Sequence, residues 1–274
     1  MGILNGIGIA IETSTLDGVP SGPGEETKFV MEVTVDATDL DFTINTGYNS
    51  GSASINFNVD WGDGNSDSGV IHDITHTYAS AGSYDVKIDG RFAMNNQQAG
   101  LTQSLKITKL KNWGTAECEF ASVYRMFYRC KNMTYDATDY PDFSNLWPSS
   151  SGPYLAELFR ECESITNLDL TGWASNLYGA KRFDQLVMMC YNLESVDLTG
   201  WDFSTQTTVS GMFRQVGTST TNGCIVTAPN MNLPIVTLLD YLVYSAKLHA
   251  DTDISGWTLG TATQRWLYTF SHVR

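Results

Sequence analysis

Three aspartates recur at one place in a repeated sequence pattern, and they are the side chains best suited to hold a cation. They are the central residues of "LDL", "VDL" and "TDI", at Asp169, Asp197 and Asp253. Because side chains alternate along a strand, each carboxylate is expected to point away from the apolar residues beside it. Paired strands lie about 4.8 Å apart, so Asp169 and Asp197 should be close enough to repel each other. The pattern predicts an exposed acidic column that is either screened by solvent or bound by a cation or cationic partner.

A second group of candidates is aromatic and lies in an irregular stretch, "TYDATDYPDFSNLWPSSSGPY". Tyrosine and tryptophan combine apolar area with a polar tip, as in surfaces that recognise carbohydrates and proteins. Many of the chain's aromatic residues must pack in the core, but long irregular segments on rigid scaffolds often carry function. If one segment contacts a ligand, we expect this one. Its candidate residues are Tyr135, Tyr140, Trp147 and Tyr154.

No motif for catalysis stands out. The five cysteines include no C-x-x-C pair and the four histidines no H-E-x-x-H, and neither a nucleophile elbow nor a phosphate-binding loop is found. An acidic chain could place two carboxylates at the spacing of a glycoside hydrolase, but no feature selects a pair. We therefore predict no enzymatic activity, no catalytic residues and no cofactor. Calcium is the alternative, because several aspartates could gather around it, although EF-hand spacing is absent. Those aspartates are Asp60, Asp63, Asp67 and Asp73.

The composition indicates a folded chain with a large core. It has 274 residues, 42% of them hydrophobic and 12% aromatic, enough for one large or two ordinary domains. Thirty acidic and sixteen basic residues give a formal net charge of -14. This charge disfavours binding to a phosphate backbone or to an anionic membrane surface. We expect no nucleic-acid partner and no membrane insertion.

The first stretch, "MGILNGIGIAIETS", does not fit a secretory signal or a membrane helix. It has no basic residue, and glycines interrupt its apolar residues, whereas both kinds of segment need an unbroken apolar run. Alternation in "IGIAIE" predicts a strand with Ile7, Ile9 and Ile11 on one face. We interpret residues 1–16 as an assembly anchor that adds a strand to another protein. Residues 17–27, "DGVPSGPGEET", are rich in Gly, Pro and acidic residues and are interpreted as a linker.

Residues 28–103 are predicted to form an all-β sandwich. Short alternating runs such as "KFVMEVTV" and "SYDVKIDG" are separated by Gly, Asn, Asp and Ser, the usual pattern of such a fold. Within it, "VDWGDG" followed by "HTYASAGSYDVKI" resembles the polycystic-kidney-disease (PKD) type of immunoglobulin-like domain over about residues 28–95. We expect His76 to be a hydrogen-bonded structural residue. The resemblance is carried by Trp61, Gly62, Asp63, Gly64, His76, Tyr78, Gly82 and Tyr84.

Residues 104–274 contain a pattern that repeats at about 28 residues. "ESITNLDLTGW" ends at Trp173, and "YNLESVDLTGW" ends at Trp201, 28 residues later. "HADTDISGW" ends at Trp257 two periods further on, "LKITKLKNW" ends at Trp113 as the first copy, and "GCIVTAPN" fills the gap before the last one. Such a period is typical of a solenoid, in which each unit buries its apolar edge by stacking on its neighbours.

Most strands of the repeat are preceded by a segment with apolar residues at helical spacing, which predicts a helix there, and a similar segment, "QRWLYTF", closes the chain. These segments are "VYRMFYRC", "YLAELFREC", "FDQLVMMC", "VSGMFRQV" and "LDYLVYSA". Cys130, Cys162 and Cys190 occupy one place in the repeat, and Val216 and Ala246 occupy it in the next two copies. A column that accepts Cys, Val and Ala predicts buried, unreactive thiols.

The combination "MF…C…L..LDLTGWD" resembles the BspA-like leucine-rich repeats of bacterial surface and prophage proteins. This resemblance implies a short α/β leucine-rich-repeat solenoid over residues 104–274. The predicted fold class is therefore mixed, with an all-β immunoglobulin-like sandwich followed by a short α/β solenoid.

Both resemblances imply surface display and adhesion rather than metabolism. With a first stretch that does not fit a secretory signal, they favour a bacteriophage virion protein, in a tail fibre, tail tip or other appendage, that recognises a host-surface glycan or protein. Other virion proteins would hold the N-terminal anchor, and a homo-oligomer is expected. The alternatives are a capsid decoration protein and a bacterial cell-surface adhesin.

Overall fold

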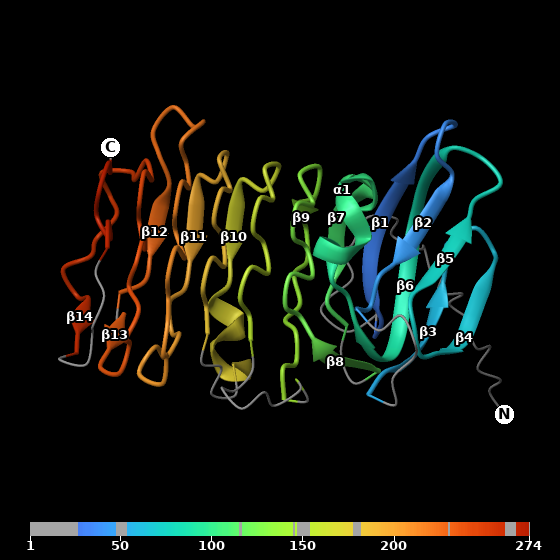
Figure 1. Cartoon of the computed structure of the whole chain (residues 1–274), viewed down its shortest axis with the longest axis horizontal. Coiled ribbons are helices and arrows are strands. Elements are labelled where there is room, and N and C mark those ends of the chain that lie inside the picture. The colour runs from blue at the N-terminus through green and yellow to red at the C-terminus, as the bar shows by residue number, and fades with distance from the viewer. Residues whose placement is uncertain are drawn as a thin grey trace, which may run out of the picture.

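The structure is a computed structural model that describes residues 27–47, 54–114, 117–144, 146, 154–177, 182–229, 231–260 and 267–273. β-Structure predominates in this part of the chain. A block of strands lies at one end of the molecule, and a row of stacked coils extends from it to the other end (Figure 1). The expected anchor with Ile7, Ile9 and Ile11 lies outside the described residues, as does all of the expected linker except Thr27.

The block is built mainly from one largely antiparallel sheet, with strand order β4-β3-β6-β1-β7-β9 and with β8 paired to β6. Phe57 and Val59 of β3 are buried between exposed neighbours, as expected for a strand with one face on the core. β2 and β5 form a separate two-stranded sheet, and Phe42 and Ile44 of β2 belong to the same buried cluster as the larger sheet. The bounds are β1 Phe29–Val35, β2 Asp41–Ile44, β3 Asn56–Asp60, β4 Ser66–Val70, β5 Ile74–Thr77, β6 Gly82–Ala93 and β8 Cys118–Ser122.

The structural role predicted for His76 is confirmed. Its Nε2 atom lies 2.8 Å from a carboxylate oxygen of Asp63, and its ring stacks on buried Trp61 with 4.9 Å between ring centroids. Gly62 has a φ of 80°, and a Cβ atom there would lie 2.7 Å from the carbonyl oxygen of Asp85. Only glycine fits this close turn. The "WGDG" motif therefore fixes the geometry of the block.

A shared sheet and a shared core join the block to the coils. Helix α1 (Asn96–Lys106) contains the predicted boundary between residues 103 and 104. β7 (Ile107–Asn112) pairs antiparallel with β1 and parallel with β9 (Thr134–Tyr135), so the sheet continues from the block into the first coil. In the part of the chain that the structure describes, no helix has the length and apolar character needed to span a membrane.

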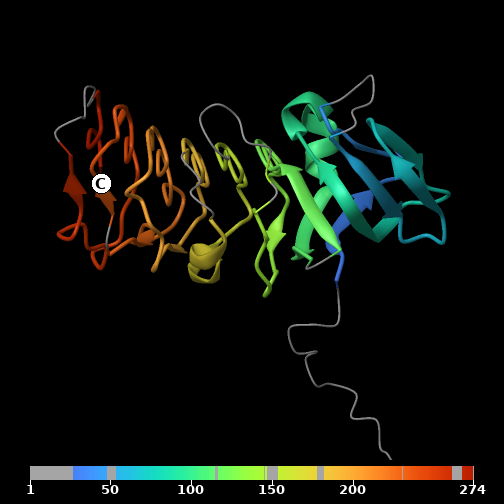
Figure 2. The same cartoon turned by 90° about the horizontal axis from the view of Figure 1, so that it is seen from below.

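The coils stack through parallel strands, as predicted for the repeat. β10 (Asn167–Asp169), β11 (Ser195–Asp197) and β12 (Ile225–Thr227) form a three-stranded parallel sheet whose central residues are buried. β12 lies in the "GCIVTAPN" segment and takes the next place after β11, which confirms the predicted position of that copy. Figure 2 shows the coils stacked along the long axis of the molecule. The remaining elements are η1 Thr171–Asn176, β13 Asn232–Leu233 and β14 Thr258–Leu259.

The helix predicted in each repeat is wrong. These segments are turns, and α1 is the one α-helix in the described part of the chain. In the first coil Arg125 and Arg129, four residues apart, have positive φ values of 59° and 62°. Turns that recur every four residues space apolar side chains almost as a helix of 3.6 residues per turn does, so eight residues do not distinguish the two. The corresponding pairs are Glu157 and Glu161, Gln185 and Met189, Gly211 and Gln215, Tyr241 and Ser245, and Tyr268 and His272.

Hydrogen bonds between coils take the place of helical ones. In each turn segment at least three N–H groups at alternate residues donate to carbonyl oxygens of the following coil, always in the same direction along the stack. The N–H groups between them donate to the carbonyl three residues earlier, as Tyr128 does to Arg125 at 3.2 Å. The central bonds of successive coils run from Phe127 to Leu158, Phe159 to Leu186, Val187 to Met212, Phe213 to Leu242 and Val243 to Thr269. The backbone therefore holds the coils in register.

The predicted column of buried thiols is confirmed. All five cysteines are free and buried, and the Sγ atoms of Cys162 and Cys190 donate to carbonyl oxygens of the preceding coil at 3.1 Å. Burial raises the pKa of Cys118 and Cys224 to about 12. These side chains fill space in the core, as the exchange with Val and Ala predicts.

Candidate functional site

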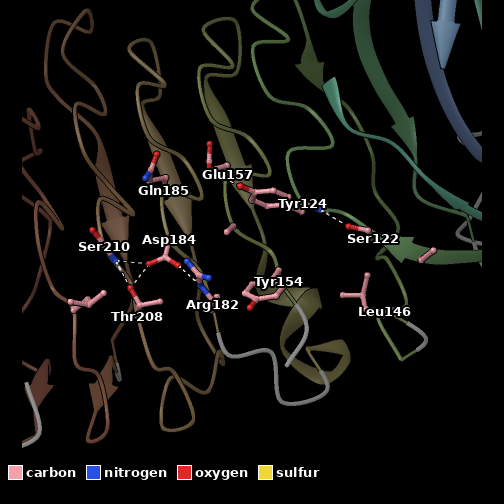
Figure 3. A pocket seen from close by; sticks show the side chains of 13 residues that line it. Ser122, Tyr124, Leu146, Tyr154, Glu157, Arg182, Asp184, Gln185, Thr208 and Ser210 are labelled. Carbon is pink, nitrogen blue, oxygen red and sulfur yellow. Dashed lines mark hydrogen bonds and ion pairs between the residues drawn. The ribbon is translucent and has the colours of Figure 1, made fainter. Parts of the chain in front are cut away.

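A cavity of about 590 Å³ opens on the side of the coils (Figure 3). Its lining combines hydroxyl groups, carboxylates and an arginine with apolar side chains, a mixture found in small-molecule sites. The lining residues are Ala121, Ser122, Tyr124, Leu146, Tyr154, Ala156, Glu157, Arg182, Asp184, Gln185, Thr208, Ser210 and Leu238.

Two lines of residues, two positions apart in sequence, build the wall of the cavity. Parallel bridges join Tyr154 to Arg182, Arg182 to Thr208 and Thr208 to Leu238 across neighbouring coils. Two positions further along each coil lie Ala156, Asp184 and Ser210, whose carbonyl groups accept the coil-to-coil hydrogen bonds. Since side chains two apart in an extended segment point to the same side, both lines face the cavity.

Arg182 stands between an aromatic ring and a carboxylate. Its guanidinium carbon lies 4.9 Å from the centroid of the Tyr154 ring, and its Nε donates to Asp184 Oδ2 at 2.8 Å. Burial disfavours the charge of Arg182, but the hydrogen bond and charge of Asp184, together with Tyr154, outweigh it and raise the pKa of Arg182. The other Asp184 oxygen accepts from the Thr208 hydroxyl, and from the Ser210 N–H at 3.1 Å. Arg182 is thus held in one orientation while part of it stays exposed.

Glu157 anchors the other side of the cavity. Its buried carboxylate accepts from Arg125 Nη2 at 2.7 Å, from Arg160 Nη1 at 2.9 Å and from the Tyr124 hydroxyl at 3.3 Å. Burial, followed by the charge of Glu157, raises the pKa of Tyr124. Charge-assisted bonds of this kind are stronger than neutral ones. The arrangement fixes donors and acceptors in place, which suits recognition of a polar ligand with several hydroxyl groups.

The structure separates the predicted aromatic candidates. Tyr154 lines the cavity. Tyr135 packs in the core, its hydroxyl accepts from Trp113 Nε1 at 3.0 Å, and burial raises its pKa to about 12. Tyr140 is half-exposed and lies against Gly172, away from the cavity lining. Trp147 lies outside the described residues.

The predicted acidic column is present in part. Asp169 and Asp197 are paired in register, but Asp197 is followed by Thr227, so Asp253 does not continue directly from the first two. Each aspartate accepts a hydrogen bond from the N–H two residues later, at 3.0, 2.8 and 2.8 Å respectively. Such bonds stabilise tight turns, which gives these carboxylates a structural task, for Asp169 and Asp197 at the ends of β10 and β11.

The four aspartates considered for calcium accept hydrogen bonds from different protein groups. Asp60 accepts from the Gly62 N–H, Asp67 from Trp61 Nε1, and Asp73 from both the N–H and the hydroxyl of Thr46. Asp63 faces His76. Among the described residues no group of three or more His, Cys, Asp and Glu side chains is arranged to hold a metal ion.

The sequence reasoning missed Glu157, Arg182 and Asp184. Glu157 and Asp184 lie in segments predicted to be helices, and Arg182 directly precedes one of them. A helix would have spread such side chains around its surface. The spacing held a usable signal, since Tyr154, Arg182 and Thr208 are 28 and then 26 residues apart, close to the period of the repeat. Comparison of the chain with protein-family models, with curated proteins and with solved structures finds no match.

Proposed function

We propose that the chain is a structural protein of a bacteriophage particle, in a tail fibre, tail tip or other appendage, and that it recognises the host surface through the coil cavity. The observation that carries this proposal is the cavity itself, where successive coils place Tyr154, Arg182 and Asp184 in fixed positions. The ligand class is a host-surface glycan or a polar protein segment. No catalytic role is assigned to any residue.

Two features of the cavity support recognition. The coil-to-coil hydrogen bonds hold its walls rigid, which lowers the entropy cost of binding. Tyr154 offers aromatic area beside a cation, and tyrosine and arginine are frequent among residues that dominate binding energy. Each carboxylate in the wall is bonded to an arginine, so the wall carries charge of both signs although the chain as a whole is strongly acidic.

The sequence resemblances support the setting. We infer that the strand block is a PKD-type immunoglobulin-like domain acting as a spacer and that the coils are BspA-like leucine-rich repeats. Domains of these kinds are associated with display and adhesion, which is an argument by analogy. A capsid decoration protein and a bacterial surface adhesin would use the same architecture in other places.

Immunogold electron microscopy with an antibody to the coils tests the setting. Label at a tail or fibre tip of purified particles supports the proposal. Uniform label over the head would assign the chain to capsid decoration, and label on bacterial envelopes but not on particles would assign it to the bacterial surface. Either of these results overturns the appendage proposal.

Recognition is tested separately with a panel of purified bacterial surface polysaccharides, immobilised and exposed to the full chain in biolayer interferometry. Binding that is weakened in Tyr154→Ala and unchanged in Tyr140→Ala supports the cavity as the site, because Tyr140 is exposed outside it. Equal, unchanged affinity in both variants would place recognition elsewhere.

A further inference from the structure

The last described coil ends the hydrogen-bond ladder with a row of donors. In every earlier turn segment, N–H groups at three equivalent positions donate to the following coil, as those of Arg125, Phe127 and Arg129 do. The corresponding groups of the last coil are those of Tyr268, Phe270 and His272, and no hydrogen bond joins them to the described part of the chain. All three lie on one edge, because the ladder runs in one direction. Unpaired backbone groups on such an edge form a template for another chain.

The same coil exposes side chains of the core type. Phe270 stands where Phe127, Phe159, Val187, Phe213 and Val243 stand in the earlier coils, all of which are fully or almost fully buried. Phe270 is 48% exposed, and Val273, at the end of the cysteine column, is 38% exposed. In every earlier coil the next coil covers these positions. The last described coil therefore presents an uncovered apolar face of the core type, beside its row of N–H donors.

The opposite edge of the stack is already covered. In the first coil the carbonyl of Met126 corresponds to that of Leu158, which accepts from the coil before it. Met126 accepts instead from the side-chain amide of Asn96, a buried residue at the start of α1. A second copy therefore cannot place its first coil on the last coil of its neighbour. The last coils of two copies cannot pair with each other either, since both edges present N–H donors and neither presents carbonyl acceptors.

The occupant must be an extended segment that brings carbonyl groups and apolar side chains. Along an extended strand, alternate residues present their carbonyls on one edge and their side chains on one face. The segment "IGIAIE" has this alternation, with Ile7, Ile9 and Ile11, and it belongs to the 26 N-terminal residues outside the described part of the chain. The strand block to which it is linked lies at the opposite end of the molecule from the last coil (Figure 1).

We propose that residues 7–11 of one copy add as a strand to the last coil, residues 267–273, of a second copy. The carbonyls of the strand accept from Tyr268, Phe270 and His272, and its isoleucines cover Phe270 and Val273. This contact joins unlike surfaces, so it propagates head to tail and closes into a ring or grows into a filament. The inference concerns assembly and does not depend on what the coil cavity binds.

Two variants of the full chain test the contact. Ile9→Asp damages the strand and leaves the coil end intact, and Phe270→Asp does the reverse. Sedimentation velocity over a range of protein concentrations should show oligomers for the unchanged chain and single chains for each variant alone. Mixing the two variants should restore a dimer that grows no further, because only one intact strand and one intact coil end remain.

Leu101→Asp is the matched control, since Leu101 of α1 is also 48% exposed but lies away from the last coil. It should leave the oligomers unchanged, and circular dichroism should show all variants folded. The proposal is overturned by an unchanged chain that stays monomeric or by oligomers that survive in both variants. It is also overturned if the two variants fail to complement each other and a synthetic peptide of residues 1–16 does not bind the unchanged coil end of Ile9→Asp.

Discussion

Arg182 lies over the ring of Tyr154 in the preceding coil, with 4.9 Å between its guanidinium carbon and the ring centroid. All arginine–tyrosine contacts of this kind in the described residues lie on the turn segments and on the line of Tyr154 beside them, and involve Arg125, Arg129, Arg160, Arg182 and Arg214. Each such contact is worth about 0.5–1 kcal/mol at an exposed site. The stacking of coils therefore concentrates aromatic rings and cations on one face of an acidic protein.

Removing the ring of Tyr154 should weaken ligand binding at the cavity by about tenfold, equivalent to about 1.4 kcal/mol. The change takes away aromatic contact area and the support that orients Arg182. Isothermal titration calorimetry with the polysaccharide identified in the panel measures it. Tyr140→Ala provides the control, and equal losses in the two variants would contradict the assignment of the site.

Gly211→Ala should destabilise the chain by about 1 kcal/mol, because an alanine there must keep a positive φ of 62° that disfavours side chains. The new Cβ would also lie 3.3 Å from the side chain of Gln185. Urea unfolding followed by tryptophan fluorescence gives the change in midpoint. Gly82→Ala should have little effect, since its φ is not positive and its Cβ would make an ordinary contact at 3.5 Å. Equal midpoints for Gly211→Ala and the unchanged chain would argue against the turn geometry.

The thiols should not react in the folded protein. Burial raises the pKa of all five cysteines, and the thiolate is the reactive form. A disulfide reagent at about pH 8 should titrate no thiol in the native chain and all five after unfolding in guanidinium chloride. Rapid reaction of even one thiol before unfolding would show that the column is open to solvent.

Stability should fall as the pH drops below about 4.5, and Glu32 should account for part of the loss. A hydrogen bond from Lys111, followed by one from Thr108, lowers the pKa of Glu32 below its ordinary value of 4.5. A carboxylate with a lowered pKa stabilises the folded state above its unfolded pKa, and this contribution is lost as the pH falls through the folded pKa. Urea midpoints measured from pH 6 down to pH 3 should decline less in Glu32→Gln than in the unchanged chain. Parallel curves would assign the acid sensitivity to other groups.

Several features followed from local sequence alone. The "WGDG…HTY" motif predicted the packing of His76, because a tight Gly turn and a large indole allow few arrangements. The 28-residue period predicted stacked parallel strands and a buried column through Cys130, Cys162 and Cys190, since residues at one place in a repeat share one environment. These predictions needed only the chain's own periodicity and the size of its side chains.

The rest was decided by contacts between coils. A helix and a stacked turn differ in the partner of the Phe127 N–H group. In a helix it would donate within its own segment, whereas here it donates to the carbonyl of Leu158, 31 residues later. The spacing of apolar side chains over eight residues does not distinguish the two. The same contacts bury Tyr135, leave Tyr154 at a cavity and bring Arg182 beside Asp184. They also cover one edge of the stack with Asn96 and leave Phe270 exposed at the other. Sequence by itself determined which residues repeat. Tertiary structure decided which of them line the cavity, because the stacking of coils depends on the partner of each backbone N–H group.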